Sequence, residues 1–258
     1  MIHIYWVIYQ VVLDMFDKLK SVVKKDKDVL KIKLPRHIAV SMDGIENWAL
    51  KNNISFEEAY KKAFLALKST IRSQVKLNIP VLSFYVLEEN YDKEDEAYPY
   101  FLDSVVEMLN DLADNEFIRD NQIKISIIGK WYKLPGRIVD AIKKAIEATK
   151  DYDSFFVNLC INYDGQEEIV DAMRLIAMQV KAGKMDPELI SKDLVKENLY
   201  SSYFLPPDLM IKNGSRKETS GFFLWDSINA KIYFTNKYWP DFDRMEFMDA
   251  IREYQKGD

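Results

Sequence analysis

The chain has 258 residues, of which 48% are apolar, which is enough for one large domain with a sizeable core. Its formal net charge of −5 and the lack of a basic stripe interleaved with aromatic residues argue against a nucleic-acid surface. One cysteine, Cys160, and two histidines, His3 and His37, exclude an internal disulfide and a Cys/His zinc cluster, and they fit a reducing, cytoplasmic setting.

The first thirteen residues are almost wholly apolar, and lysines follow at positions 18, 20, 24 and 25. The segment lacks a charged start, a cleavage site and the length of a membrane span. We expect an amphipathic helix over residues 1–30, ahead of one domain over residues 31–258. The helix would pack on this protein or on a partner, or make peripheral membrane contact through residues 1–25.

Six short runs rich in β-branched or aromatic residues predict strands at 38–42, 81–87, 123–128, 155–161, 209–211 and 232–234. Apolar spacings of three and four predict helices at 56–75, 98–112, 137–149 and 167–180. Ser55 is a helix start, Gly183 a helix stop, and Asp186-Pro187 opens a further short helix. Strands alternating with helices predict an α/β fold: a single domain with a central, mostly parallel sheet of about six strands flanked by helices.

Asp43 directly follows the first predicted strand. Because ligands of open parallel sheets gather beyond the carboxyl ends of the strands, Asp43 lies at the rim where a site would form. A carboxylate there could hold Mg²⁺ together with a substrate diphosphate. The alternative is a carboxylate that caps the turn or the following helix.

Several distinct short segments follow one another between residues 35 and 242. They include Met42-Asp43-Gly44, Asn47-Trp48-Ala49, Phe223-Leu-Trp225, Tyr233-Phe-Thr235 and Trp239-Pro-Asp-Phe242. In order and spacing they resemble the signature segments of the cis-prenyltransferases, the family that includes undecaprenyl and dehydrodolichyl diphosphate synthases. The resemblance implies the undecaprenyl diphosphate synthase fold and the condensation of isopentenyl diphosphate onto an allylic diphosphate, with the growing chain in an apolar tunnel.

The resemblance also implies roles for particular residues. Asp43 would be the catalytic residue, binding Mg²⁺ and the allylic diphosphate, and Gly44, Asn47, Trp48 and Lys61 would contact substrate. The isopentenyl diphosphate would be held by a later set: Lys212, Arg216, Lys217 and Ser220. The expected partners are the two diphosphates and a second chain, in a homodimer or in a heterodimer with a cis-prenyltransferase paralogue.

The chain departs from the family pattern where diphosphates would bind. Ile45 and Glu46 stand where the family has small residues before its arginine, and Phe56 stands at a later arginine position. The two arginines for isopentenyl diphosphate correspond to Lys212 and Glu218, and the second Mg²⁺-binding glutamate corresponds to Lys231. Lysine lacks the bidentate fork of arginine, glutamate repels phosphate, and a lysine cannot coordinate a cation.

Three functions are compatible with these residues. The first is a catalytically weak or silent subunit that pairs with a normal cis-prenyltransferase. The second is an active transferase that adds one cis isoprene unit. The third is a non-condensing protein that binds isoprenoid diphosphates.

Overall fold

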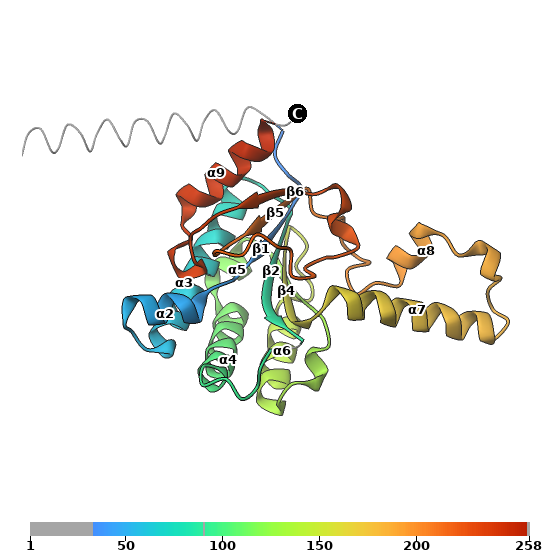
Figure 1. Cartoon of the computed structure of the whole chain (residues 1–258), viewed down its shortest axis with the longest axis horizontal. Helices are drawn as coiled ribbons and strands as arrows, with labels where there is room; N and C mark the ends of the chain where they lie inside the picture. The colour runs from blue at the N-terminus through green and yellow to red at the C-terminus, as the bar shows by residue number, and fades with distance from the viewer. Residues whose placement is uncertain (1–32, 90, 257–258) are drawn as a thin grey trace, which may run out of the picture.

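The computed structural model describes residues 33–89 and 91–256 and shows six strands and their helices in one α/β domain (Figure 1). The strands are β1 (His37–Ser41), β2 (Val81–Glu88), β3 (Ile123–Ile128), β4 (Phe155–Tyr163), β5 (Leu209–Lys212) and β6 (Lys231–Phe234). The α-helices of the described residues are α2 (Ile45–Asn52), α3 (Phe56–Lys76), α4 (Tyr98–Asp114), α5 (Glu116–Asp120), α6 (Gly136–Thr149), α7 (Gly165–Lys181), α8 (Lys192–Glu197) and α9 (Arg244–Gln255).

All strand pairs are parallel, and the strand order is β3-β4-β2-β1-β5-β6. This confirms the predicted single domain with a six-stranded parallel sheet. Because β1 pairs with both β2 and β5, the carboxyl ends of these three strands lie side by side although their sequences are far apart. Ligand sites of parallel sheets form at such an edge.

Two apolar layers cover the sheet. The larger one packs α3, α4, α6 and α9 against one face, with the strand residues Ile38, Phe84 and Leu159 fully buried. The smaller one covers the other face with Phe204, Phe222 and other residues that follow α8. Burial along most of β1, β2, β4 and β5 explains why their sequences are nearly continuous apolar runs, whereas the edge strand β6 is partly exposed.

The helix predictions hold closely. Ser55 caps α3, since its Oγ accepts a hydrogen bond of 3.2 Å from the Glu58 N–H, and Gly183 follows α7 with a φ of +66°. The turn after Asp186 is a 3₁₀ helix, Pro187–Leu189, rather than the start of an α-helix. The expected amphipathic helix lies outside the described residues. Within 33–89 and 91–256, none of the helices combines the length and apolarity that crossing a membrane requires.

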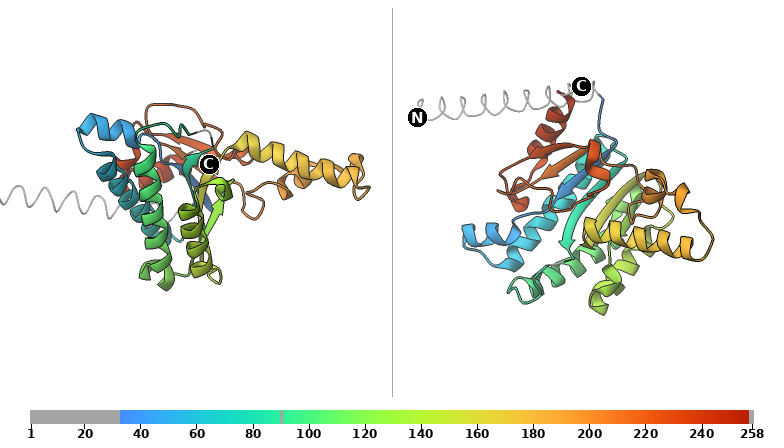
Figure 2. Two further views of the ribbon diagram at one scale, coloured as in Figure 1. Left: turned by 90° about the horizontal axis from the view of Figure 1, so that it is seen from below. Right: turned by 45° about the vertical axis from the view of Figure 1, so that its right-hand side comes forward.

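Helices α7 and α8 extend away from the sheet as an arm (Figures 1 and 2). We use "the arm" for residues 165–197. The arm exposes several large apolar side chains, whereas a helix on a protein surface normally turns its apolar side chains toward the core. They are Val170, Met173, Leu175, Met178, Leu189 and Ile190.

Candidate functional site

A pocket of about 340 Å³ opens at the carboxyl ends of β1, β2 and β5, and we call it the polar pocket. Its lining comes from three chain segments that the strand order brings together. These are Met42 to Asn47 after β1, Tyr85 to Glu88 of β2, and Asn213 to Arg216 after β5. Tyr60, Tyr91, Phe101, Ser220 and Tyr238 complete the lining among the described residues.

Asp43 lines the polar pocket and forms an ion pair with Lys212. The Lys212 Nζ lies 2.7 Å from Asp43 Oδ2, and the lysine side chain is 1% exposed whereas the carboxylate is 34% exposed. The ammonium therefore neutralises Asp43 from the protein side, while the carboxylate faces the pocket. Sequence reasoning named both residues as site residues but did not pair them.

A second carboxylate, Glu88 at the end of β2, also lines the polar pocket. Burial and the charge of Asp43 raise the pKa of Glu88, and the positive charges of Lys212 and Arg216 oppose that shift. The two carboxylates thus share one electrostatic environment, in which Lys212 is the buried positive charge.

The N-terminus of α2 forms one wall of the pocket. Its N-cap is Gly44, whose φ of +82° suits glycine, and a Cβ there would lie 2.2 Å from Cδ1 of Tyr238. As a glycine, Gly44 has no side chain that could cap the first turn of α2 with a hydrogen bond, so the backbone N–H groups of this turn suit an anion. Asn47, a predicted site residue, lies in this turn and lines the pocket.

Asn213 is a site residue that sequence reasoning missed. It lines the pocket and is 1% exposed, yet neither atom of its side-chain amide has a hydrogen-bond partner in the described structure. Its backbone N–H donates to Ser41 Oγ at 3.1 Å, which fixes the residue beside β1. A buried amide without partners is destabilising and can be satisfied by a polar group of a ligand. The available signal was its position two residues after the predicted strand 209–211.

Glu46 is held by the protein rather than left free for a ligand. Its Oε1 accepts hydrogen bonds from the hydroxyls of Tyr60, at 2.6 Å, and Tyr91, at 3.3 Å. Burial and the neighbouring Glu46 charge raise the pKa of Tyr60 well above its ordinary value, so its hydroxyl stays a donor. This carboxylate therefore adds negative charge where the family pattern has a phosphate cradle.

Four of the predicted substrate residues are not among the described residues that line the polar pocket: Trp48, Lys61, Lys212 and Lys217. Trp48 is buried, donates from Nε1 to Asp241 Oδ2 at 2.7 Å, and packs beneath the ammonium of Lys62. Lys61 is exposed on α3 and pairs with Glu57 at 2.5 Å. Trp48 thus contacts the turn before α9 instead of the pocket.

The loop after β5 carries the remaining predicted residues. Arg216 lines the pocket with its side chain 85% exposed, and its Nη1 lies 3.7 Å from Glu218 Oε1. Ser220 also lines the pocket, and its carbonyl accepts a hydrogen bond of 3.3 Å from the Tyr85 hydroxyl. Lys217 is exposed in the same loop and is not among the described residues that line the pocket.

The donor set does not fit a preformed magnesium site. Residues 33–89 and 91–256 contain no group of three or more His, Cys, Asp or Glu residues that could hold a metal ion by themselves, so one or two carboxylates with phosphate and water would have to hold it. Asp43 already has an ammonium at its carboxylate. Lys231, at the family's second metal position, donates to the Tyr254 carbonyl at 2.8 Å.

A small apolar cavity of about 20 Å³ adjoins the polar pocket. Met42, Ile45, Tyr60, Val86 and Phe101 line both spaces and so form the partition between them. Room for about one water molecule cannot hold a prenyl tail. In the described structure, the space behind this partition is too small for the expected apolar tunnel.

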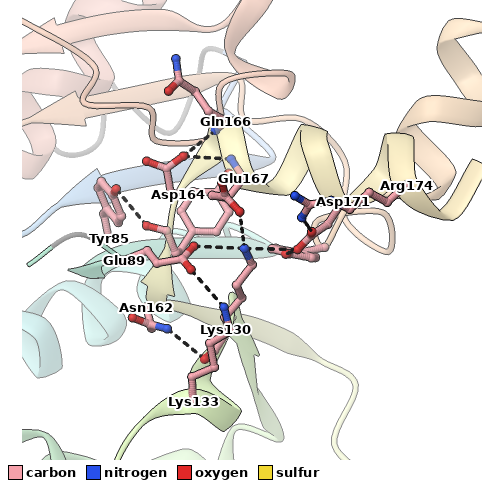
Figure 3. Close-up of polar contacts among 12 residues, drawn as sticks. Tyr85, Glu89, Lys130, Lys133, Asn162, Asp164, Gln166, Glu167, Asp171 and Arg174 are labelled. Carbon is pink, nitrogen blue, oxygen red and sulfur yellow. Dashed lines mark hydrogen bonds and ion pairs between the residues drawn. The ribbon is translucent and has the colours of Figure 1, made fainter.

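Beside the pocket, a buried lysine joins the loop after β2 to the base of the arm (Figure 3). Lys130 Nζ lies 2.6 Å from Glu167, 3.3 Å from Asp171 and 3.4 Å from Glu89, and its side chain is 5% exposed. Burial lowers the pKa of Lys130, but the hydrogen bond to Glu167 and the charges of Glu89 and Asp171 outweigh it and raise the pKa. We call these four residues the Lys130 cluster. Sequence reasoning missed it because its members are spread over three elements.

Comparisons with known proteins agree on one family. The undecaprenyl diphosphate synthase family model matches residues 41–258 of this chain. A tritrans,polycis-undecaprenyl-diphosphate synthase (geranylgeranyl-diphosphate specific) of Methanocaldococcus jannaschii is 34% identical over 252 residues, covering 95% of this chain and 87% of that protein. An isoprenyl transferase of Streptococcus thermophilus is 31% identical over 238 residues, covering 90% of this chain and 95% of that protein.

The fold has a solved relative as well. The crystal structure of lavandulyl diphosphate synthase from Lavandula x intermedia, in complex with dimethylallyl diphosphate, superposes with a TM-score of 0.82 at 28% identity. The match covers 86% of this chain and 95% of the other. The similarity therefore extends over nearly the whole domain.

Proposed function

The chain belongs to the undecaprenyl diphosphate synthase family of prenyltransferases, and we propose that it acts as a catalytically weak or silent subunit of a heteromeric polyprenyl diphosphate synthase. One observation carries the proposal: the carboxylate of Asp43, the expected catalytic residue, is already neutralised by the buried ammonium of Lys212. A ligand that needs this carboxylate must first displace an internal partner.

The charge around the pocket supports a weak diphosphate site. The carboxylates of Asp43, Glu46 and Glu88 line it, and Arg216 is the cation among the described lining residues. Arg216 is largely exposed and lies beside Glu218, so solvent and that carboxylate both weaken the electrostatic attraction between its guanidinium and a phosphate. Each lost charge-assisted contact weakens binding by roughly 1.5–3 kcal/mol.

The arm supports the presence of a second chain. Its exposed Met173, Met178 and Leu189 lie on one continuous extension of the domain (Figure 2). Apolar side chains gathered on a protruding element are typical of protein interfaces. The partner would be a cis-prenyltransferase paralogue in a heterodimer, or an identical chain in a homodimer. In a cytoplasmic protein, residues 1–25 would contact the partner or a membrane surface.

Incorporation of labelled isopentenyl diphosphate tests the proposal. The purified chain is assayed alone and mixed with a catalytic paralogue, in the presence of Mg²⁺ and several allylic primers. We expect little product from the chain alone and more product from the mixture than from the paralogue alone. The Asp43→Asn variant is the control: once circular dichroism shows that it is folded despite the loss of the carboxylate beside Lys212, it should support the mixture as well as the unchanged chain does. Turnover by the chain alone at rates typical of synthases would contradict a silent subunit.

An active transferase is the second candidate. Its support is the similarity to relatives named as synthases over more than nine-tenths of the chain. In that reaction the allylic C–O bond breaks and diphosphate leaves, a C–C bond forms to the isopentenyl double bond, and a proton is lost. Asp43 would hold the allylic diphosphate with Mg²⁺, while Lys212, Arg216, Lys217 and Ser220 would hold isopentenyl diphosphate. Loss of turnover in Asp43→Asn, assayed alone, separates this candidate from the first.

A non-condensing binder of isoprenoid diphosphates is the third candidate. The uncapped N-terminus of α2 and the unpartnered amide of Asn213 support binding of an anionic head group. Calorimetric titration with farnesyl diphosphate, geranylgeranyl diphosphate and polyprenyl phosphates distinguishes it. Binding without product, both alone and in the mixture, would favour this candidate.

A further inference from the structure

The position of Lys212 is fixed by the sheet. It is the last residue of β5, which pairs in parallel with β1 so that Val40 lies beside Ile211. The hydrogen bond from the Asn213 N–H to Ser41 Oγ, at 3.1 Å, continues this contact one step beyond the paired strands. The lysine side chain therefore emerges directly beside Asp43, and the 2.7 Å ion pair follows from the strand register.

Burial makes this ion pair hard to replace. The Lys212 side chain is 1% exposed, so its ammonium has lost almost all contact with water and depends on Asp43 for charge compensation. A metal ion that binds the Asp43 carboxylate must share it with the ammonium or leave the ammonium buried without a partner. Both alternatives are unfavourable, because like charges repel and an unpaired buried charge is strongly destabilising.

Resting on the proposed function, we propose that Lys212 is a built-in counter-ion that occupies the cation position at Asp43 and keeps divalent metal out of the polar pocket. This position of Lys212 would explain why the charges around Asp43 do not suit the metal ion that the family uses. The metal is excluded by a specific side chain rather than by loss of the carboxylate.

The neighbouring carboxylate sharpens the expectation. Glu88 lines the same pocket, and its environment includes the charges of both Asp43 and Lys212. Removing the ammonium leaves two carboxylates facing one pocket without their buried positive charge. Mg²⁺ and Mn²⁺ are held by one or two carboxylates completed by water, so the variant should gain affinity for them.

The test is a titration of the full chain with Mn²⁺, followed by electron paramagnetic resonance of the free ion. We expect the Lys212→Met variant to lower the Kd for Mn²⁺ at least tenfold relative to the unchanged protein. Adding Asp43→Asn to that variant should reverse the gain. The matched control is Lys144→Met, because Lys144 Nζ also lies 2.7 Å from an aspartate, Asp114, but this pair is exposed on α6 and α4. Lys144→Met changes the net charge of the protein by the same amount as Lys212→Met, and its Kd for Mn²⁺ should stay within twofold of that of the unchanged protein.

Two results would overturn the inference. One is a folded Lys212→Met variant, judged by circular dichroism, with the Mn²⁺ affinity of the unchanged protein. The other needs no lysine variant: tight Mn²⁺ binding by the unchanged protein that Asp43→Asn abolishes. If Lys212→Met does not fold, this second measurement still decides. Turnover by the chain alone, combined with weak Mn²⁺ binding, would contradict the silent subunit and leave the role of Lys212 intact.

Discussion

Protonation of the buried His37 should destabilise the fold in mildly acidic solution. His37 begins β1 and is 1% exposed. Its Nδ1 lies 2.6 Å from the Leu205 carbonyl, which can only accept, so Nδ1 carries the proton. Nε2 then accepts from the Ser83 hydroxyl at 2.8 Å, and Ser83 Oγ in turn accepts from Asn158 Nδ2 at 3.0 Å. With a neutral ring, both ring nitrogens therefore have a hydrogen-bond partner.

The size of the effect follows from the pKa. Burial lowers the pKa of His37 to about 4 from 6.5, although the hydrogen bond to Leu205 and the charges of Asp226 and Asp208 act in the opposite direction. The unfolded chain therefore binds the proton first as the pH falls. The contribution of the neutral His37 ring to the free energy of unfolding is fully present above pH 6.5. It is lost progressively between pH 6.5 and 4 and changes no further below pH 4. The total is about 3 kcal/mol, from 1.36 kcal/mol per pKa unit.

Urea denaturation at pH 7.5 and pH 5.0 measures this effect. Over that interval His37 should account for a loss of about 2 kcal/mol in the free energy of unfolding. The His37→Gln variant keeps a polar side chain without a titrating ring, so its stability should fall by about 2 kcal/mol less between the two pH values. Other titrating groups are common to both proteins and cancel in the comparison. Equal pH dependence of the two proteins would refute the reasoning.

Five further variants, of which Lys133→Met and Gly136→Ala are controls, test other contacts by urea denaturation. Lys130→Met should lower the free energy of unfolding by about 3–5 kcal/mol because three carboxylates lose a buried partner, whereas Lys133→Met, whose side chain is 54% exposed, should lower it by less than about 1 kcal/mol. Gly165→Ala should destabilise by roughly 1–3 kcal/mol, since its Cβ would lie 2.1 Å from the Gly221 carbonyl. Gly136→Ala, with open space around its Cβ, should stay within about 1 kcal/mol. Asn213→Ala should change stability by less than about 1 kcal/mol, because its amide makes no hydrogen bonds in the described structure; a larger loss would mean that the amide is satisfied.

Strands β1, β2, β4 and β5 were predictable because they are buried along most of their length and are therefore largely apolar. The edge strand β6, whose Ile232 and Phe234 are exposed, was predictable from its β-branched and aromatic residues. The long helices were predictable from their apolar spacing and, for α3, from the cap at Ser55. Helix α2 was missed because it has eight residues and begins at a glycine in the left-handed conformation, without a side-chain cap. Helix α9 was missed because its sequence, Arg244–Gln255, is rich in charged residues and buries one narrow face.

The site was predictable only in part. The sequence indicated that Asp43 and Lys212 both follow strands, but their contact depends on β1 and β5 being neighbours, which the sequence does not state. The same holds for Glu46, whose tyrosine partners come from α3 and from the loop after β2. The residue types showed which side chains carry charge, but only the order of the strands in the sheet showed which charged side chains are in contact.

The partition between the polar pocket and the apolar cavity has a consequence for the protein without ligand. A family fold that kept an open apolar channel would expose that surface to water whenever no lipid filled it. Here Tyr60, Phe101 and their neighbours leave a cavity of about 20 Å³ behind the polar pocket, so little apolar surface is open to water at this place. A ligand-free chain with this arrangement keeps these apolar side chains out of water without a lipid in place.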